Sequence, residues 1–434
     1  MKSIVNQKKN SKLNLIGYAC QNLDVEDDIY KTCRINNFND EIARQLIANN
    51  LNVLEGMIDY NIKHNIKMFR ITSSLIPFAS NLDVMKLDWQ SEFRQKLDEI
   101  KTKITSNNMR ISVHPGQYTV LNSLTEEVVK RSILELEYHV DILESLGGSQ
   151  NSKMIVHIGG VFGDKEGSIK RFIEVANTRL SERIRRHLIL ENDDRLYNVE
   201  ELLYIAKKAN LPMVFDNLHN ECNPGPHKLS ERDILLQAFA TWTAEDGRPK
   251  IHYSQQALDK RTGAHTYTIN AEKFYDFYAP LQDLVFDIML EVKDKNRSTI
   301  KINTLLSKDI KEAEKEWSRY KYLVLGKSQQ SYGVIREMLK DKVNFSALSF
   351  YKTIDDALML QEDTMREVNS LEHVWGYFKK VASEKEKLTF AKTLASYKLG
   401  ETKLLTTKKQ LKKLAIKYNE LYLLNSYYFN HETL

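Results

Sequence analysis

The feature that most constrains the fold of this chain is a series of eight short apolar segments, several of which end in a polar or metal-binding side chain. Their apolar runs are nearly continuous, as expected of parallel strands covered on both faces. The segments are residues 13–18, 67–71, 110–114, 153–157, 187–191, 212–216, 250–253 and 284–291. Between them lie stretches with apolar residues at intervals of three and four, which are typical of amphipathic helices. Examples are residues 41–64, 89–106, 126–146, 169–180 and 198–209.

This alternation of strand and helix patterns, without the glycine fingerprint of a dinucleotide-binding fold, predicts a (β/α)8 TIM barrel. We place the barrel in residues 1–303. In such a barrel the carboxyl-terminal ends of all strands meet at one rim, and active sites are built there. The polar residues that end the apolar segments are therefore expected to converge.

The pattern changes after about Asn303, where strand signals stop and only helical periodicity remains. We expect a smaller all-helical C-terminal domain of unknown role in residues 304–434. Its helices are predicted at 308–325, 332–342, 349–361, 384–397 and 408–424. It contains a run of lysines that we interpret as a solvated helix face, namely Lys403, Lys408, Lys409, Lys412, Lys413 and Lys417.

Composition limits the classes of protein that this chain can belong to. The first dozen residues lack the apolar core of a signal peptide, and no run of 18 apolar residues occurs, so we expect a cytoplasmic protein without a membrane partner. Only three cysteines, Cys20, Cys33 and Cys222, are present, too few and too scattered for a disulfide framework. The formal net charge of +5 permits nucleic-acid binding without arguing for it.

Eight histidines and carboxylates fall at or just after the proposed strand ends. A single histidine there is more often a hydrogen-bonded rim residue than a ligand, but eight such groups on one rim suit a cluster of divalent cations such as Zn²⁺ or Mn²⁺. Clustered cations often serve phosphate-ester hydrolysis. The candidate ligands are His114, His157, Glu191, Asp216, His219, His252, His265 and Glu291.

Lys250 does not fit a cationic site in its ordinary form. It lies two residues before His252 on a strand, so both side chains point to the same face. An ammonium group beside metal cations is strongly disfavoured. Lys250 must therefore turn away, lose its proton, or be converted chemically into an anion.

The motifs at these positions resemble those of the UV damage endonucleases. The resemblance runs in order across residues 13–296. It rests on GYACQN (17–22), TCR (32–34), FRITSSLIPFAS (69–80), HPGQYTVLNS (114–123), HIGGVFGDK (157–165), LENDDR (190–195), FDNLHN (215–220), KIHYSQQ (250–256), GAH (263–265) and MLEVKDK (289–295).

This resemblance implies an ATP-independent DNA repair endonuclease with a barrel like that of endonuclease IV and no nucleotide cofactor. Its partner would be damaged double-stranded DNA, nicked immediately 5′ of cyclobutane dimers and 6-4 photoproducts, and often of abasic sites. The products would carry a 3′-hydroxyl and a 5′-phosphate. The implied cofactor is a cluster of up to three divalent metal ions, typically manganese.

The resemblance also assigns functional roles of the family to individual residues of this sequence. The metal ligands fall on the eight residues named above, and the catalytic centre would contain Glu191, Glu291 and Lys250, the last matching a carboxylated lysine. One departure is Asn81, a weaker ligand at a position where the family commonly has histidine. Gln117 and Tyr118 match a lesion-probing pair, and Tyr18 and Asn22 match residues beside the flipped lesion. From their place near the rim, Arg34 and Arg70 are candidates for phosphate contacts.

Two other classes of function remain open at this point. Metal-dependent sugar isomerases share the barrel and the His/carboxylate rim, but would have no affinity for DNA. A non-catalytic DNA-damage binder would follow if Asn81 has removed a metal ion from the site.

Overall fold

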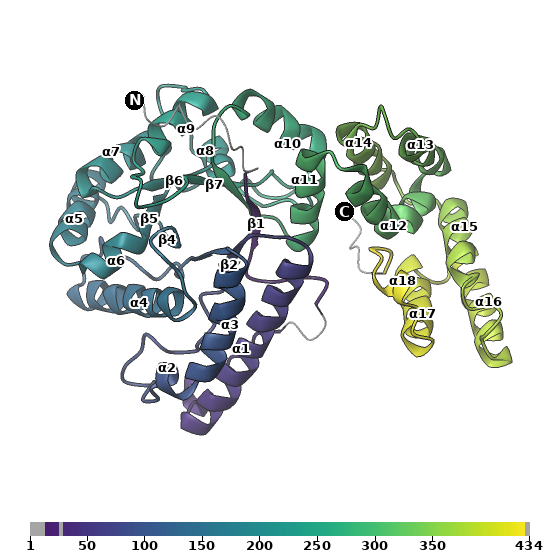
Figure 1. Cartoon of the computed structure of the whole chain (residues 1–434), viewed down its shortest axis with the longest axis horizontal. Helices are drawn as coiled ribbons and strands as arrows, with labels where there is room; N and C mark the ends of the chain where they lie inside the picture. The colour runs from purple at the N-terminus through teal and green to yellow at the C-terminus, as the bar shows by residue number, and fades with distance from the viewer. Residues whose placement is uncertain (1–13, 26–28, 430–434) are drawn as a thin grey trace. The chain divides into compact units, whose positions relative to one another are not determined.

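The computed structural model describes residues 14–25 and 29–429. Eight parallel strands form a closed barrel (Figure 1). They follow one another in chain order, and β8 pairs with β1. The strands are β1 (Ile16–Ala19), β2 (Met68–Ile71), β3 (Arg110–Val113), β4 (Lys153–Val156), β5 (Leu188–Glu191), β6 (Met213–Asp216), β7 (Lys250–Tyr253) and β8 (Asp287–Leu290). The predicted TIM barrel is confirmed.

Every residue of the eight strands is buried, which explains their nearly continuous apolar sequences. At one point the strands approach so closely that only glycine fits. A Cβ on Gly17 would lie 2.4 Å from the carbonyl oxygen of Met68 on the neighbouring strand. The first predicted segment, 13–18, begins outside the described residues, and β1 ends one residue beyond it, at Ala19. The last predicted segment, 284–291, is longer than β8 because its apolar residues begin in the preceding loop.

Helices surround the strands on the outside of the barrel (Figure 1). They are α1 (Asp40–Lys63), α2 (Trp89–Glu92), α3 (Arg94–Ser106), α4 (Glu126–Ser145), α5 (Lys165–Thr178), α6 (Glu182–His187), α7 (Val199–Ala209), α8 (Asn217–Cys222) and α9 (Glu231–Phe239). The single helix predicted over 89–106 is wrong. Phe93 leaves helical geometry with ψ of 17° and separates α2 from α3, a backbone break that apolar periodicity does not reveal.

The chain consists of two compact units, residues 1–269 with 279–300, and residues 270–278 with 301–434. The described helices of the second unit, here called the helical unit, are α10 (Ala271–Tyr278), the end of α11 (Asn296–Ser307), α12 (Ile310–Lys327), α13 (Gln329–Lys340), α14 (Ala347–Leu358), α15 (Thr364–Trp375), α16 (Glu384–Lys398), α17 (Leu404–Lys417) and α18 (Leu421–Leu424). Its core includes Leu371, Val374, Phe390 and Leu411.

Helix α10 belongs to the helical unit although it precedes β8 in the chain. The buried Asp355 carboxylate of α14 accepts the backbone N–H of Ala271 at 2.8 Å and the Nζ of Lys301 at 2.5 Å. The division between the units falls within α11, whereas the boundary after residue 303 stays a sequence-based prediction.

Two features of the helical unit differ from the predicted helices. Residues 408–424 are not one helix, because the chain leaves α17 after Lys417 and Asn419 adopts a left-handed φ of 50° before α18. Helix α15 lies outside the predicted helices, although it packs extensively on α12. Within the described residues, no helix is long and apolar enough to cross a membrane.

Candidate metal centre at the barrel rim

Six of the eight candidate ligands lie at the carboxyl-terminal ends of six consecutive strands, β3 to β8. Glu191 and Asp216 are the last residues of β5 and β6, and His252 lies in β7. His114, His157 and Glu291 follow directly on β3, β4 and β8. Since all strands are parallel, these six side chains belong to one rim, as the sequence indicated.

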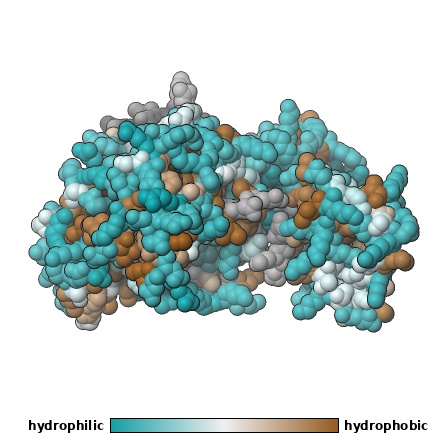
Figure 2. Space-filling view, turned by 90° about the horizontal axis from the view of Figure 1, so that it is seen from below, coloured by the Kyte–Doolittle hydropathy of each residue, from teal (hydrophilic) through white to brown (hydrophobic). Residues whose placement is uncertain are grey.

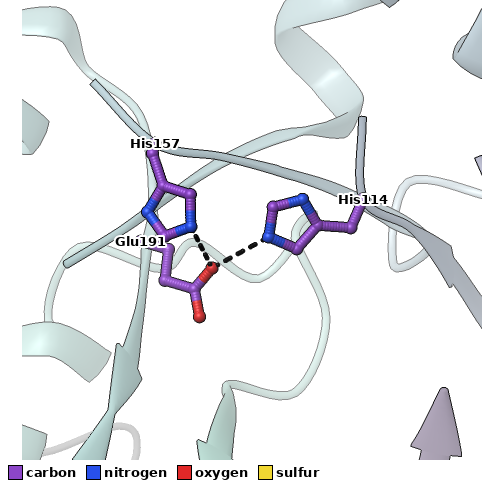
Figure 3. A group of neighbouring side chains, drawn as sticks. All are labelled: His114, His157 and Glu191. Carbon is purple, nitrogen blue, oxygen red and sulfur yellow. Dashed lines mark hydrogen bonds and ion pairs between the residues drawn. The ribbon is translucent and has the colours of Figure 1, made fainter. Parts of the chain in front are cut away.

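Glu191 is the centre of the cluster and is only 1% exposed. Its Oε2 lies 3.1 Å from His114 Nε2 and 3.3 Å from His157 Nε2, so both imidazoles point at one carboxylate (Figure 3). Its Oε1 lies 2.6 Å from His252 Nδ1. One buried carboxylate therefore joins imidazoles from three strands.

The ligand atoms form two overlapping groups in which all atoms lie within 4.8 Å of one another. The first group is His114, His157 and Glu191, and the second is Glu191, Asp216, His252 and Glu291. Glu191 belongs to both. Mixed imidazole and carboxylate donors suit Zn²⁺ or Mn²⁺.

Two buried polar atoms of the site that lack a hydrogen-bond partner are also consistent with a bound cation. Asp216 Oδ2 and His252 Nε2 are buried and have no hydrogen-bond partner among the described residues. Buried polar atoms are normally paired, so these atoms fit ligation of a group that the protein itself does not supply.

The electrostatics of the site depend on which neighbours each carboxyl group has. Burial alone would raise the pKa of Glu191, but the imidazoles of His252, His157 and His114 outweigh it and hold this pKa well below its usual value. Burial raises the pKa of Asp216. The site thus keeps Glu191 as a carboxylate.

Two predicted ligands lie outside both groups. His219 Nδ1 lies 2.9 Å from the carbonyl oxygen of Asn192 and 3.8 Å from Asp216 Oδ1. Burial lowers the pKa of His219, but Asp216, Glu191 and Glu291 raise it to about 9. His265 forms an isolated β-bridge with Gln256. Their ligand roles stay predictions.

Lys250 is the first residue of β7 and is 1% exposed. Burial, together with Arg110 and Arg70, lowers the pKa of Lys250 well below its usual value, although Glu191 and Glu291 oppose this. This environment disfavours the protonated amine, so loss of the proton and conversion into an anion both fit it among the three alternatives that the sequence left open.

Asn81 lies in an exposed turn, where its Oδ1 accepts the backbone N–H of Asp83 at 3.2 Å. It belongs to neither ligand group. The geometry of Asn81 is that of a residue closing a turn, and a ligand role for it stays a prediction.

The predicted DNA-contacting residues differ in accessibility. Gln117 and Tyr118 are exposed on the loop after β3, Tyr118 to 84%, and Arg34 is also exposed. Tyr18 is buried, and its hydroxyl donates to Asn61 Oδ1 and accepts from Asn22 Nδ2, both at 2.7 Å.

Arg70 is buried as well, and its Nη1 donates to Glu291 Oε1 at 2.5 Å. The guanidinium thus balances a rim carboxylate in this structure, and a phosphate contact by Arg70 stays a prediction.

Sequence reasoning missed two asparagines that hold the strand ends together. Asn192 accepts the backbone N–H of Asp216 at 2.9 Å and donates to its carbonyl oxygen at 3.0 Å. Asn217 bonds the backbone of Ser254 in the same way, at 2.8 and 3.0 Å. The available signal was the repeated order of carboxylate then asparagine in Glu191-Asn192 and Asp216-Asn217.

A TIM barrel with a buried His/carboxylate cluster on its carboxyl-terminal rim defines the class of metal-dependent barrel enzymes. Within that class the comparisons are specific. The UV-endonuclease UvdE family matches residues 14–321, and the chain belongs to it. It is therefore a nuclease, a phosphodiester hydrolase, with DNA as its substrate. Membership in this family disfavours both the sugar isomerase and the non-catalytic binder.

Individual relatives agree with this assignment. A UV DNA damage endonuclease of Clostridium perfringens is 35% identical over 421 residues, covering 96% of this chain and 99% of that protein. One from Bacillus cereus is 34% identical over 264 residues, covering 60% of this chain and 82% of that protein. A crystal structure of SacUVDE is 37% identical with a TM-score of 0.63, covering 68% of this chain and 99% of that chain. Residues 321–432 match DUF1722, a family of proteins of unknown function.

Proposed function

We propose that this nuclease cuts the DNA backbone immediately 5′ of cyclobutane dimers and 6-4 photoproducts, and also at abasic sites, leaving a 3′-hydroxyl and a 5′-phosphate. The observation that carries the proposal is the convergence of His114, His157 and His252 on the Glu191 carboxylate. Relatives named UV DNA damage endonucleases support ultraviolet lesions as the target.

We further propose that the site holds up to three divalent cations, with Mn²⁺ as the physiological metal. When bound, such cations offset the negative charge that develops on the phosphoryl oxygens during hydrolysis. Carboxylates and imidazoles of the rim would hold them, namely His114, His157, Glu191, Asp216, His219, His252, His265 and Glu291.

Lys250 is proposed to carry a carboxyl group. Its environment favours the neutral amine, and that form reacts with carbon dioxide by forming an N–C bond and releasing a proton. The resulting carbamate is an anion, which suits a position beside cations. Intact-protein mass, measured with and without bicarbonate, tests this addition.

Lesion selectivity is proposed to reside in the loop after β3. A damaged base is stacked and paired less well than a normal base, so extruding it from the duplex costs less. Gln117 and Tyr118 are exposed three and four residues beyond His114, where they can reach the space that an extruded lesion leaves.

Incision of an ultraviolet-irradiated supercoiled plasmid, with Mn²⁺ and with excess EDTA, tests the function. Nicking that requires both irradiation and Mn²⁺ is expected. A labelled duplex with one cyclobutane dimer then gives the position of the cut and the chemistry of its ends. Equal nicking of irradiated and unirradiated plasmid would contradict lesion specificity, and binding without nicking would support a damage-binding protein.

A further inference from the structure

The positive charge of this chain is concentrated in its C-terminal part. Residues 301–434 contain 24 Lys and Arg against 17 Asp and Glu, a formal charge of +7, whereas residues 1–300 contain 39 against 41, a formal charge of −2. The barrel that carries the nuclease site is thus slightly acidic before any cation binds. A polyanion such as DNA gains little long-range attraction from a protein of that net charge.

Within residues 301–434, the excess of basic over acidic residues lies mainly in the segment that contains α16 and α17. Residues 379–417, here called the basic hairpin, contain 12 lysines, no arginine and three acidic residues, a formal charge of +9. The two helices pack on each other, and Lys417 near the end of α17 pairs with Glu386 near the start of α16 at 2.6 Å. Since the helices are antiparallel, one compact element carries this charge.

Most of these lysines form no ion pair within the described residues. Four of them pair with acidic residues, at Glu384, Glu372, Glu367 and Glu386. Seven others are exposed and form no ion pair with any described residue, namely Lys379, Lys380, Lys385, Lys392, Lys403, Lys409 and Lys413. The face of the helical unit seen in Figure 2 is mainly hydrophilic, with separate hydrophobic positions.

The charges at the start and along the exposed face of α17 are unfavourable for the helix. Its first turn has no acidic residue, and its N-cap is Lys403, which makes no capping hydrogen bond. Negative charge is favoured at a helix N-terminus, and like charges four residues apart, as in Lys409 and Lys413, are destabilising. A bound polyanion would relieve both effects, which a merely solvated face leaves uncompensated.

We propose that the basic hairpin binds the phosphate backbone of double-stranded DNA without reading its sequence. This inference rests on the proposed function, because it takes DNA as the polyanion. Lysine ammonium groups are point charges suited to phosphates, and backbone contacts of this kind supply non-specific affinity. By holding undamaged DNA, the hairpin raises the effective concentration of duplex at the barrel in the same chain. On this proposal the lysine run that was interpreted above as a solvated helix face would contact DNA.

The test compares two variants of the full chain that lose the same charge. In the hairpin variant, Lys385, Lys392, Lys409 and Lys413 are changed to Gln. In the control variant, Lys101, Lys130, Lys170 and Lys207, exposed on the outer barrel helices α3, α4, α5 and α7, are changed to Gln. Affinity for an undamaged duplex is measured by fluorescence anisotropy at several salt concentrations, and unfolding is monitored by circular dichroism.

The slope of log Kobs against log salt concentration should decrease in magnitude by about 0.9 for each phosphate that the variant no longer neutralises, up to about 3.6 for four phosphates. At low salt the hairpin variant should bind undamaged duplex at least about tenfold more weakly, whereas the control variant should bind as the wild type does. An unchanged slope in the hairpin variant, or an equal change in both variants, would overturn the proposal.

Further measurements identify which polyanion the basic hairpin binds and distinguish a failure of this proposal from a failure of the proposed nuclease function. The hairpin also exposes Leu388, Leu399, Leu405 and Ile416, so vesicles of anionic phospholipid are tested beside duplex RNA. Loss of binding confined to vesicles or to RNA would overturn the assignment to DNA. Because binding to undamaged duplex is measured without incision, a wild type that binds through the hairpin but does not nick irradiated plasmid refutes the proposed function alone.

Discussion

Arg70 of β2 and Glu291, which directly follows β8, form a largely buried ion pair, with Nη1 of Arg70 2.5 Å from Oε1 of Glu291. The two residues are 221 positions apart in the sequence. Burial alone would raise the pKa of Glu291, but Arg70 and His252 outweigh it and lower it. A carboxylate of the candidate metal centre therefore has its charge balanced by the protein itself.

Replacing Arg70 by Met should destabilise the metal-free protein by about 3–5 kcal/mol, because it removes the guanidinium partner of Glu291 in a largely buried site. Added Mn²⁺ should stabilise this variant more than it stabilises the wild type, since a cation then supplies the missing positive charge. Urea unfolding with EDTA and with Mn²⁺ measures both effects. Arg44→Met, which breaks an exposed pair with Glu92, should change stability by less than about 1 kcal/mol.

Glu191→Gln should keep the fold and lower incision by more than about 100-fold, the upper end of the effect seen for residues that only support a metal ligand. The amide cannot balance the charge of cations or serve both ligand groups as the carboxylate does. Nicking rate and metal content by elemental analysis are the measurements. Asp194→Asn, on the same loop but in neither ligand group, is the control. Near wild-type nicking by Glu191→Gln would remove Glu191 from the metal centre.

Asn81→His should raise the affinity for Mn²⁺ if this loop reaches the cluster, because imidazole is a stronger ligand than an amide. Metal stoichiometry and activity at limiting Mn²⁺ are compared with those of Leu82→His, at the next exposed position. Identical values for wild type and Asn81→His would mean that residue 81 only closes its turn.

Changing Gln117 and Tyr118 together to Ala should weaken binding to dimer-containing duplex by about tenfold, which corresponds to about 1.4 kcal/mol. Stacking of a base on an aromatic ring is worth on the order of 1–3 kcal/mol, and Tyr118 is exposed enough to provide it. Affinity for undamaged duplex and metal content should not change. Tyr204→Ala, an exposed tyrosine on α7, is the matched control, and equal losses on both duplexes would exclude the pair from lesion recognition.

Asp355→Ala should destabilise the helical unit by about 3–5 kcal/mol, because it leaves the buried Lys301 without this partner and removes the acceptor for the Ala271 N–H. The exposed neighbour Asp356→Ala should have little effect. Thermal unfolding of the full chains compares the two. A small effect of Asp355→Ala would show that α10 is held by its apolar contacts alone.

Much of the site was predictable from the sequence because its ligands occupy equivalent local positions. An apolar run of strand length followed by histidine, glutamate or aspartate defines both a strand and its end, and barrel closure brings such ends to one rim. His114, His157, Glu191, Asp216, His252 and Glu291 were found in this way, without any information about distances.

The sequence alone determined the order of strands and helices, the burial of the strands and the residue types at the rim, since these depend on local periodicity and residue chemistry. Only the tertiary structure decided which side chains meet. The convergence of three imidazoles on Glu191, the pairing of Arg70 with Glu291 and the packing of α10 with α14 join residues far apart in the chain. Such contacts depend on strand register and side-chain rotamers, which local patterns do not encode because each is selected by neighbours that arrive from other parts of the chain.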